Sequence, residues 1–424
     1  MSETLCTIIN ASLYFTLFFT YYRKTNTFNH GTFVLFLWLT CAIVGVLYEP
    51  INIYGHMRKI TLWPYIYLFV CNLFLLIPIL LFKSNKIIDI GVQQKLLYKF
   101  AIIVAIISLF PLAESILYYA KNHSNTSMML DAFNERYEDS STTYYYLTTF
   151  SRRITHIHHS IRLIILFLVF YMPTMKYKPR GFKLVYIGVC ISALLIPIES
   201  LCLLARFQVV IAVFLGFYIY LIVRDIYSSK LKVKVSKIMK YAILTFAILQ
   251  LVQTANRYLN YTENLNMESV GMIAYLGQYI GESMGNFNGN IVHSDYYLGT
   301  EPILRTYGEL FGVEFEQSHY LENRFHTNQF FTVVGEFWRA YGGVSTFIIF
   351  SFIFIIAGTL IKRLNYERMS FFAFMMFLLY SKLAIVGIFY HAYFVDKYEL
   401  IVVPIVSLFL SNKSYGNNFR YSTL

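Results

Sequence analysis

Residues 324–343 read Arg324-Phe-His-Thr-Asn-Gln-Phe-Phe-Thr-Val-Val-Gly-Glu-Phe-Trp-Arg-Ala-Tyr-Gly-Gly343. This stretch ends the longest polar segment of the chain, 257–329, and leads directly into the apolar run 344–361. Charged groups at membrane depth are costly, so their presence at such an edge points to function. Arg324, His326, Asn328, Glu336 and Arg339 fall within sixteen positions here.

The apolar run that follows this stretch is one of many, and together these runs decide the fold class. The chain has 424 residues, of which 57% are hydrophobic and only 14% charged, with a mean hydropathy of +0.53. Soluble domains carry about 25% charged residues. The runs are about 20 residues long, the length that a helix needs to cross ~30 Å of hydrocarbon. They lack the alternation of barrel strands. The sequence therefore predicts an all-α, multi-pass integral membrane protein.

We predict about eleven membrane helices, within a range of ten to twelve. Their predicted positions are 4–22, 32–48, 61–82, 97–118, 154–173, 184–204, 206–223, 239–256, 344–361, 370–391 and 399–411. In domain terms, residues 1–256 hold eight helices and a polar outer loop at 119–153. Residues 257–343 form a large outer lobe that carries the site, and residues 344–424 hold the last helices and a cytoplasmic tail.

Lysine and arginine divide unequally between the two alternating sets of loops. Twenty-one lie in one set and ten in the other, which includes 119–153 and 257–343. Cytoplasmic loops carry the excess of Lys and Arg. The segment 257–343 is therefore predicted to face the periplasm. The net charge of +12 follows this topology, and segment 257–329 has nine acids against three bases, so nucleic-acid binding is not supported.

The five cysteines all fall in or beside apolar runs, and none forms a C-x-x-C pair. The sequence therefore supports neither a disulfide framework nor a zinc site.

Arg206 opens an apolar run that follows the previous run almost without a connection. A tight outer hairpin would place Arg206 near the edge of the bilayer. One interpretation is a snorkelling arginine that holds a lipid phosphate. The other is an inward-facing arginine that binds a substrate pyrophosphate, for which a planar fork of donors is suited.

A second constellation lies in Ser151-Arg-Arg-Ile-Thr-His-Ile-His-His-Ser-Ile-Arg162. On a helix, Arg152, His156 and His159 would share one face at i, i+4 and i+7. Two of these histidines, His156 and His159, are spaced to share a metal. However, no nearby acid or cysteine completes a ligand set, so we predict no metal site. A cationic patch at the mouth of a cavity and a plain outer helix end both stay open.

The opening stretch is the third constellation. Glu336 and Arg339 are three residues apart and could simply pair with each other on a helix. His326 could be a surface histidine without a task. Alternatively, a neutral imidazole beside Arg324 at membrane level is what a general base needs at pH 7.

The whole layout resembles the O-antigen and capsule repeat-unit polymerases, the Wzy family. The resemblance rests on many membrane helices with a large outer loop late in the chain, on Arg206 at the start of a mid-chain helix, and on Arg-x-His-x-Asn-x-x-x-Thr (Arg324 to Thr332) followed by Tyr341-Gly342-Gly343. The related O-antigen ligases share this architecture and a similar late His-Asn signature.

This resemblance implies a glycosyltransferase in the bacterial inner membrane. It would polymerise undecaprenyl-pyrophosphate-linked repeat units at the periplasmic face, without a cofactor or nucleic acid. Its partners would be lipid-linked glycans, membrane lipids and a chain-length regulator. The implied catalytic residues are His326, Arg324 and Arg206. The residues that we predict to bind substrate are Asn328, Glu336, Arg339, Arg305, Arg152 and His156.

Two alternatives stay open. An O-antigen ligase, which moves the glycan to the lipid A core, would have the same donor and another acceptor. A polysaccharide flippase would show polar residues along a path through many helices and symmetry between halves. The sequence instead concentrates its polar groups on one side.

Overall fold

The computed structural model describes residues 1–48, 59–122, 144, 146–203, 206–265, 272–293, 332–390 and 398–412. Tyr48, Arg206, Phe207 and most of 249–265 and 272–279 are described by their helical backbone only. The described chain falls into two compact units. The first unit is drawn from residues 1–82, 244–364 and 380–397, and the second from 83–243, 365–379 and 398–424.

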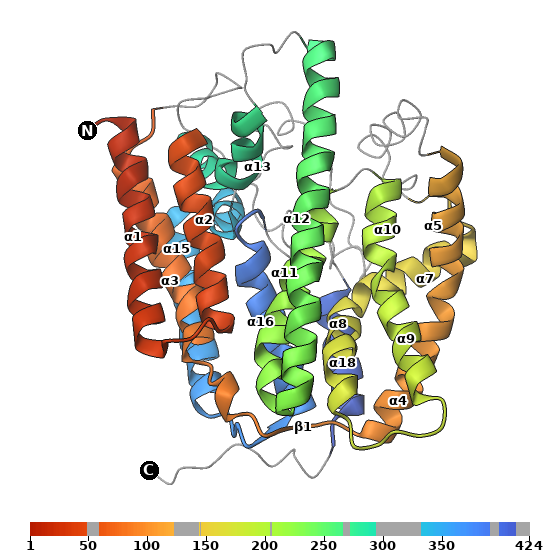
Figure 1. Ribbon diagram of the computed structural model, residues 1–424. Coiled ribbons are helices and arrows are strands. Elements are labelled where there is room, and N and C mark those ends of the chain that lie inside the picture. Colours follow the sequence, from red (N-terminus) through yellow and green to blue (C-terminus); the bar gives the residue numbers. More distant parts are fainter. Residues whose placement is uncertain are drawn as a thin grey trace, which may run out of the picture. The chain divides into compact units, whose positions relative to one another are not determined.

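The first unit is a group of helices packed side by side (Figure 1). It comprises α1 (Glu3–Thr25), α2 (His30–Tyr48), α3 (Leu62–Leu81), α13 (Met272–Asn286), the π-helix η5 (Phe287–Ile291) and α15 (Val333–Lys362). Helix α2 packs against α1 and α13, and α3 packs against α1 and α15.

The second unit holds shorter helices and two short strands. Its elements are η1 (Ser84–Lys86), β1 (Asp89–Gly91), α4 (Gln94–Ile107), α5 (Leu109–Asn122), α7 (Thr149–Ser160), α8 (Arg162–Tyr171), η3 (Met172–Thr174), α9 (Phe182–Ala193), α10 (Leu195–Cys202), α11 (Arg206–Val223), η4 (Arg224–Ile226), β2 (Arg368–Ser370) and α18 (Glu399–Leu410). Helices α12 (Ser229–Leu265) and α16 (Phe371–Val386) contribute residues to both units.

The prediction of a mostly helical chain with apolar helices that could span a membrane is confirmed, whereas the count of eleven spans is not. Among the described residues, seven helices are long and apolar enough to cross a membrane. The α7–α8 pair, bent by 68°, makes eight if it is one broken span. Helices α16 and α18 are apolar but have only 16 and 12 residues, fewer than the ~20 that a perpendicular span needs.

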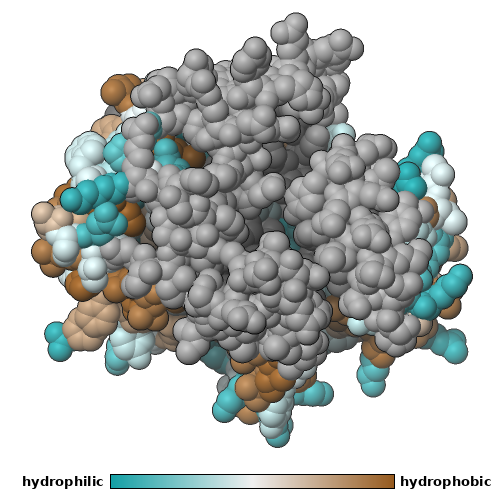
Figure 2. Space-filling model, turned by 90° about the horizontal axis from the view of Figure 1, so that it is seen from above, coloured by the Kyte–Doolittle hydropathy of each residue, from teal (hydrophilic) through white to brown (hydrophobic). Residues whose placement is uncertain are grey.

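Apolar side chains face outward on the flanks of these helices, as a lipid-embedded surface requires. Figure 2 shows them in brown on the described parts of the surface. Exposed large hydrophobic residues include Ile103 and Ile106 on α4, Leu184 and Ile187 on α9, and Phe352, Ile355 and Ile356 on α15.

The contact between α13 and α2 depends on glycine. A Cβ placed on Gly281 would lie 2.7 Å from the backbone nitrogen of Gly45 and 2.9 Å from its Cα, so the two backbones touch directly. Small residues at such crossings allow helices to approach closely in a membrane. Gly285, four residues further along α13, has no described atom within 4 Å of the same ideal position.

These two glycines make a matched test of the contact. Gly281→Ala is expected to destabilise the protein by about 1–3 kcal/mol, because overpacking forces backbones apart. Gly285→Ala is expected to be neutral or slightly stabilising, because alanine favours the helix by ~1 kcal/mol. Thermal unfolding of both purified variants in detergent measures the difference. Equal unfolding temperatures would contradict the close backbone contact.

In the second unit, two long helices are interrupted at similar points, and proline explains both interruptions. Helix α4 gives way to α5 at Ser108, and Pro111 follows three residues later. Helix α9 gives way to α10 at Leu194, and Pro197 follows three residues later. Proline has no N–H for the carbonyl four residues earlier, so a helix bends at that point.

The third interruption is the 68° bend between α7 and α8, which Figure 1 shows as α7 turned across the direction of α8. No proline lies here. Instead, the Ser160 hydroxyl donates to the His156 carbonyl oxygen at 2.8 Å, and such back-bonding often bends helices. His158, just before the bend, donates from Nε2 to the Ser192 carbonyl oxygen at 3.0 Å. Ser192 Oγ donates to Ser108 Oγ at 2.7 Å. One polar chain therefore links the three interruptions.

Two short strands and their neighbouring loops join the C-terminal end of α8 to the N-terminal end of α9, and we call this group of strands and loops the clip. Strand β1 pairs in parallel with β2, with Asp89 opposite Arg368. The Gln93 backbone N–H donates to the Leu410 carbonyl oxygen at 2.9 Å. Gln94 Oε1 accepts from the backbone N–H groups of Lys176 and Tyr177. The clip therefore brings together four segments, near residues 89–94, 176–177, 368–370 and 410–412. The distribution of Lys and Arg predicts that all four face the cytoplasm.

Candidate functional site

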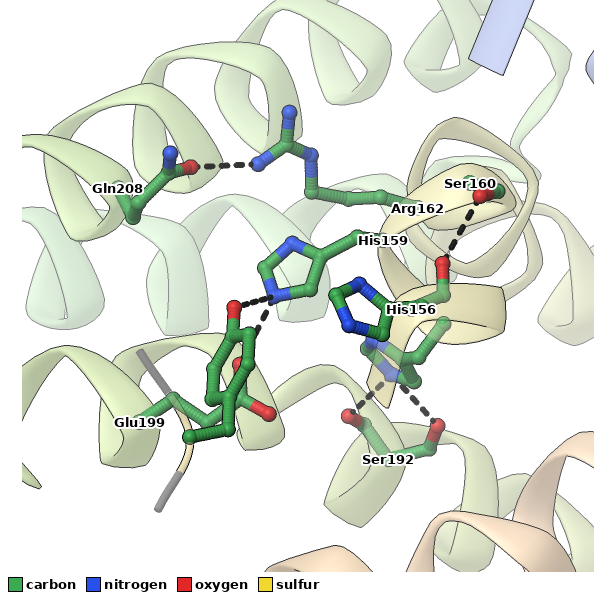
Figure 3. A network of polar contacts seen from close by, with 9 residues as sticks. His156, His159, Ser160, Arg162, Ser192, Glu199 and Gln208 are labelled. Atoms are coloured by element: carbon green, nitrogen blue, oxygen red, sulfur yellow. Dashed lines mark hydrogen bonds and ion pairs between the residues drawn. The ribbon is translucent and has the colours of Figure 1, made fainter. Parts of the chain in front are cut away.

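The bend between α7 and α8 places a fully buried arginine inside the second unit. Arg162 is the first residue of α8 and has no exposed surface. Its Nη1 donates to Gln208 Oε1 at 2.9 Å (Figure 3). Helix α8 spans ten residues from Arg162 to the clip end, where the Tyr171 hydroxyl donates to the Ile90 carbonyl oxygen. At about 1.5 Å per residue, Arg162 lies about 15 Å from that end along α8.

Gln208 belongs to the first turn of α11, whose first residue is Arg206. Helix α10 ends at Cys202, so only three residues connect α10 to α11. Helices α10 and α11 pack against each other, as expected from the short connection in the sequence. The backbone of Arg206 lies two residues from the glutamine that holds Arg162. The α11 N-terminus adds the partial positive charge of unpaired N–H groups, which favours anions.

A buried acid meets a histidine beside this arginine. His159, in the last turn of α7, has Nε2 2.9 Å from Glu199 Oε2 on α10. The Tyr144 hydroxyl lies 3.3 Å from the same nitrogen. Figure 3 shows the imidazole of His159 directed toward Glu199, with His156 beside it. Glu199 retains 3% of its side-chain exposure and His159 17%, so the acid is buried and the imidazole is partly accessible.

The other predicted members of this constellation lie on the same helix. Arg152 and His156 are both on α7, as the sequence pattern predicted. The His156 ring lies edge-on to Tyr144, with centroids 5.5 Å apart. His156 is exposed. Among the described residues, Nε of Arg152 is buried without a hydrogen-bond partner. The orientation of α7 therefore leaves His156 exposed and the Arg152 Nε without a described partner.

A second acid, Glu114 of α5, fixes the start of α7. Its carboxylate accepts from the Thr148 backbone N–H at 2.8 Å, from the Thr148 hydroxyl at 2.9 Å and from the Ser151 hydroxyl at 2.6 Å. Sequence reasoning assigned no role to Glu114 or Glu199. The available signal was that each is a lone acid within a predicted membrane span, which is itself a mark of function or pairing.

In the first unit, Glu336 and Arg339 lie near the start of α15. Arg339 Nη2 is 3.6 Å from Glu336 Oε2, and both residues are buried. The i, i+3 pairing considered from the sequence is therefore present. The helix starts at Val333, capped by the Thr332 hydroxyl, so the predicted boundary at 343/344 falls inside it. A break at Gly342, with φ of 78°, marks that boundary, and positive φ is a conformation that glycine adopts readily.

The first unit also contains a ladder of polar side chains at the end of α13. Asn290 Nδ2 donates to Asn286 Oδ1 at 3.3 Å, and Asn286 Nδ2 donates to Glu282 Oε1 at 3.0 Å. Asn288 fixes the π-helix η5 by accepting from the Thr61 backbone N–H and donating to its carbonyl oxygen. Burial raises the pKa of Glu282 from 4.5 to about 7, against the lowering effect of the Asn286 hydrogen bond.

This raised pKa predicts a pH-dependent stability. Between pH 4.5 and 7 the folded state holds a proton that the unfolded state has lost. Stability therefore falls as pH rises through this window and levels off above it. The shift corresponds to about 3 kcal/mol. Glu282→Gln is expected to remove this part of the slope and to be more stable than wild type at pH 8. Thermal unfolding in detergent at pH 5, 6, 7 and 8 tests this, with the exposed Glu367→Gln as a control that should retain the wild-type slope.

Several predicted site residues lie outside the described residues. Arg305, Arg324, His326 and Asn328 are among them, and Arg206 is described by its backbone alone. Their roles stay predictions from the sequence. In the described parts of the chain, no group of three or more His, Cys, Asp or Glu side chains is placed to hold a metal.

The second unit therefore combines a buried guanidinium, a helix N-terminus headed by a second arginine, and a histidine paired with a carboxylate. The first two can bind a phosphate or pyrophosphate, and the third can move a proton. Comparison with family models, curated proteins and solved structures finds no match to this chain.

Proposed function

We propose that this protein is a membrane glycosyltransferase that joins lipid-linked oligosaccharide repeat units into a polysaccharide. In this proposal the chain has about eleven spans and lies in the inner membrane of a bacterium. It acts at the periplasmic face on undecaprenyl-pyrophosphate-linked glycans, as the resemblance to the Wzy polymerases implies. A chain-length regulator is a candidate partner.

The observation that carries the proposal is the environment of Arg162. A fully buried arginine among apolar helices is costly and is not needed to complete a helix. It stands at a helix interruption, held by Gln208 in the first turn of α11. Interrupted helices at membrane depth are tolerated where they are buried in protein or line a cavity, and they form substrate sites in other membrane proteins.

The chemistry fits this arrangement. The donor glycan leaves a lipid pyrophosphate, so negative charge grows on the bridging phosphate oxygen in the transition state. Fixed cations at that position accelerate the chemical step more than they tighten binding. We assign this task to Arg206, Arg162 and the sequence-predicted Arg324. Arg152, His156, Arg305, Asn328, Glu336 and Arg339 are assigned to the glycans and their phosphates.

The test uses a deletion strain and purified protein. Deletion is expected to leave single repeat units attached to their final acceptor and to abolish long chains. Purified protein in liposomes should convert undecaprenyl-pyrophosphate-linked repeat units into a ladder of polymers without a nucleotide sugar. Long chains that accumulate on the lipid carrier without transfer to their final acceptor would indicate a ligase instead. Repeat units trapped at the cytoplasmic face would indicate a flippase. Either result would overturn the proposal.

A further inference from the structure

The two ring nitrogens of His159 have different environments. Nε2 lies 2.9 Å from Glu199 Oε2 and 3.3 Å from the Tyr144 hydroxyl. Within the described chain, no residue forms a hydrogen bond with Nδ1. The imidazole keeps 17% of its exposure, whereas its acidic partner keeps 3%. A pair with a purely structural task would bury both partners, as His158 is buried against Ser192.

This geometry fixes the tautomer of a neutral His159. A carboxylate can only accept hydrogen bonds, so Nε2 carries the proton and donates it to Glu199. Nδ1 then presents a lone pair. When Nδ1 takes up a proton, the carboxylate stabilises the resulting imidazolium and keeps the ring in place. This is the role that a buried acid plays behind a catalytic histidine elsewhere.

The position of the pair suits a reaction at the pyrophosphate. His159 precedes Arg162 by three residues, on the other side of the helix bend. Figure 3 shows both side chains emerging from the same short segment, with Gln208 and Glu199 reaching them from other helices. A proton acceptor and a cation are thus held close together by one rigid feature of the fold.

We propose that His159, oriented by Glu199, is the proton acceptor of the glycosyl transfer, an inference that rests on the proposed function. The acceptor hydroxyl oxygen forms a bond to the anomeric carbon of the donor. The bond from that carbon to the pyrophosphate oxygen breaks, and its electron pair leaves with the lipid pyrophosphate. The hydroxyl proton passes to His159 Nδ1 and from there to water. This assignment differs from that of His326, which the sequence suggested.

The experiment compares single-turnover rates of purified variants in liposomes, expressed per folded protein as judged by thermal unfolding. His159→Gln is expected to lower the rate by roughly 10²–10⁴-fold, the usual loss of one general base. Glu199→Gln should also lower it, because the amide can donate to Nε2 and shift the ring proton to Nδ1. His158→Gln is the matched control on the same helix turn. It should retain the rate, since its amide can still donate to the Ser192 carbonyl.

Two further measurements separate proton transfer from packing. Added imidazole should restore part of the rate to His159→Gly and none to Arg162→Ala. In His159→Gln, the KM for the lipid-linked substrate should equal that of wild type, while kcat should fall. A wild-type rate in His159→Gln together with a large loss in His326→Gln would overturn the role of His159 and leave the proposed function standing. Wild-type protein that forms no polymer would overturn the proposed function itself.

Discussion

Arg206→Ala is expected to abolish long chains while the protein still accumulates in the membrane. Arg206 opens α11, two residues before the glutamine that holds Arg162, where a pyrophosphate would meet two cations and a helix N-terminus. Removing one donor from developing charge costs about 10²–10³-fold in rate. Arg206→Lys should recover only part of the activity, because an ammonium lacks the bidentate fork.

Polymer length on gels and the single-turnover rate in liposomes measure this effect. Arg180→Ala, an exposed arginine in the loop between η3 and α9, is the matched control and should behave as wild type. Polymer formation at the wild-type rate in Arg206→Ala would show that Arg206 is a lipid-facing anchor, the alternative that the sequence left open.

The second large effect is expected at Arg162. Arg162→Met removes the buried charge and should lower the rate by at least about 10²-fold. It also leaves Gln208 without its donor, which costs stability, so this variant alone does not separate charge from packing.

Gln208→Glu makes that separation. It keeps the length of the side chain and its hydrogen bond to Arg162, but it neutralises the guanidinium. We expect this variant to fold with an unfolding temperature at or above that of wild type and to lose most activity. An active Gln208→Glu protein would show that Arg162 has a structural task only.

The helical scaffold could be predicted from the sequence because a membrane imposes it. Runs of about 20 apolar residues have one stable outcome in lipid, and helices begin near most of the predicted positions. Pro111 and Pro197 lie at two of the three interruptions, whereas 97–118 and 184–204 are each predicted from the sequence as one unbroken helix. The bend at Ile161 carried no such signal, because it depends on the Ser160 hydroxyl and on what packs around the joint.

The candidate site was predicted in part. The shared helix face of Arg152 and His156, the Glu336–Arg339 pair and the packing of α10 on α11 all follow from local spacing. The His159–Glu199 pair joins residues 40 positions apart on separate helices, and no local pattern specifies it. No acid lies close to these histidines in the chain, whereas folding supplies one from α10.

Helix α18 is synthesised after the helices that it supports, and this order has a consequence for activity. This helix, the last among the described residues, packs against α7 and α8, and its Leu410 carbonyl oxygen accepts from the Gln93 backbone N–H. Val402 of α18 joins the cluster around Ile161 at the bend. The ribosome has therefore made α7 and α8 well before the partner that supports the bend emerges. Nascent chains halted before residue 399 should be inserted yet inactive, and a separately expressed C-terminal fragment should be able to restore them.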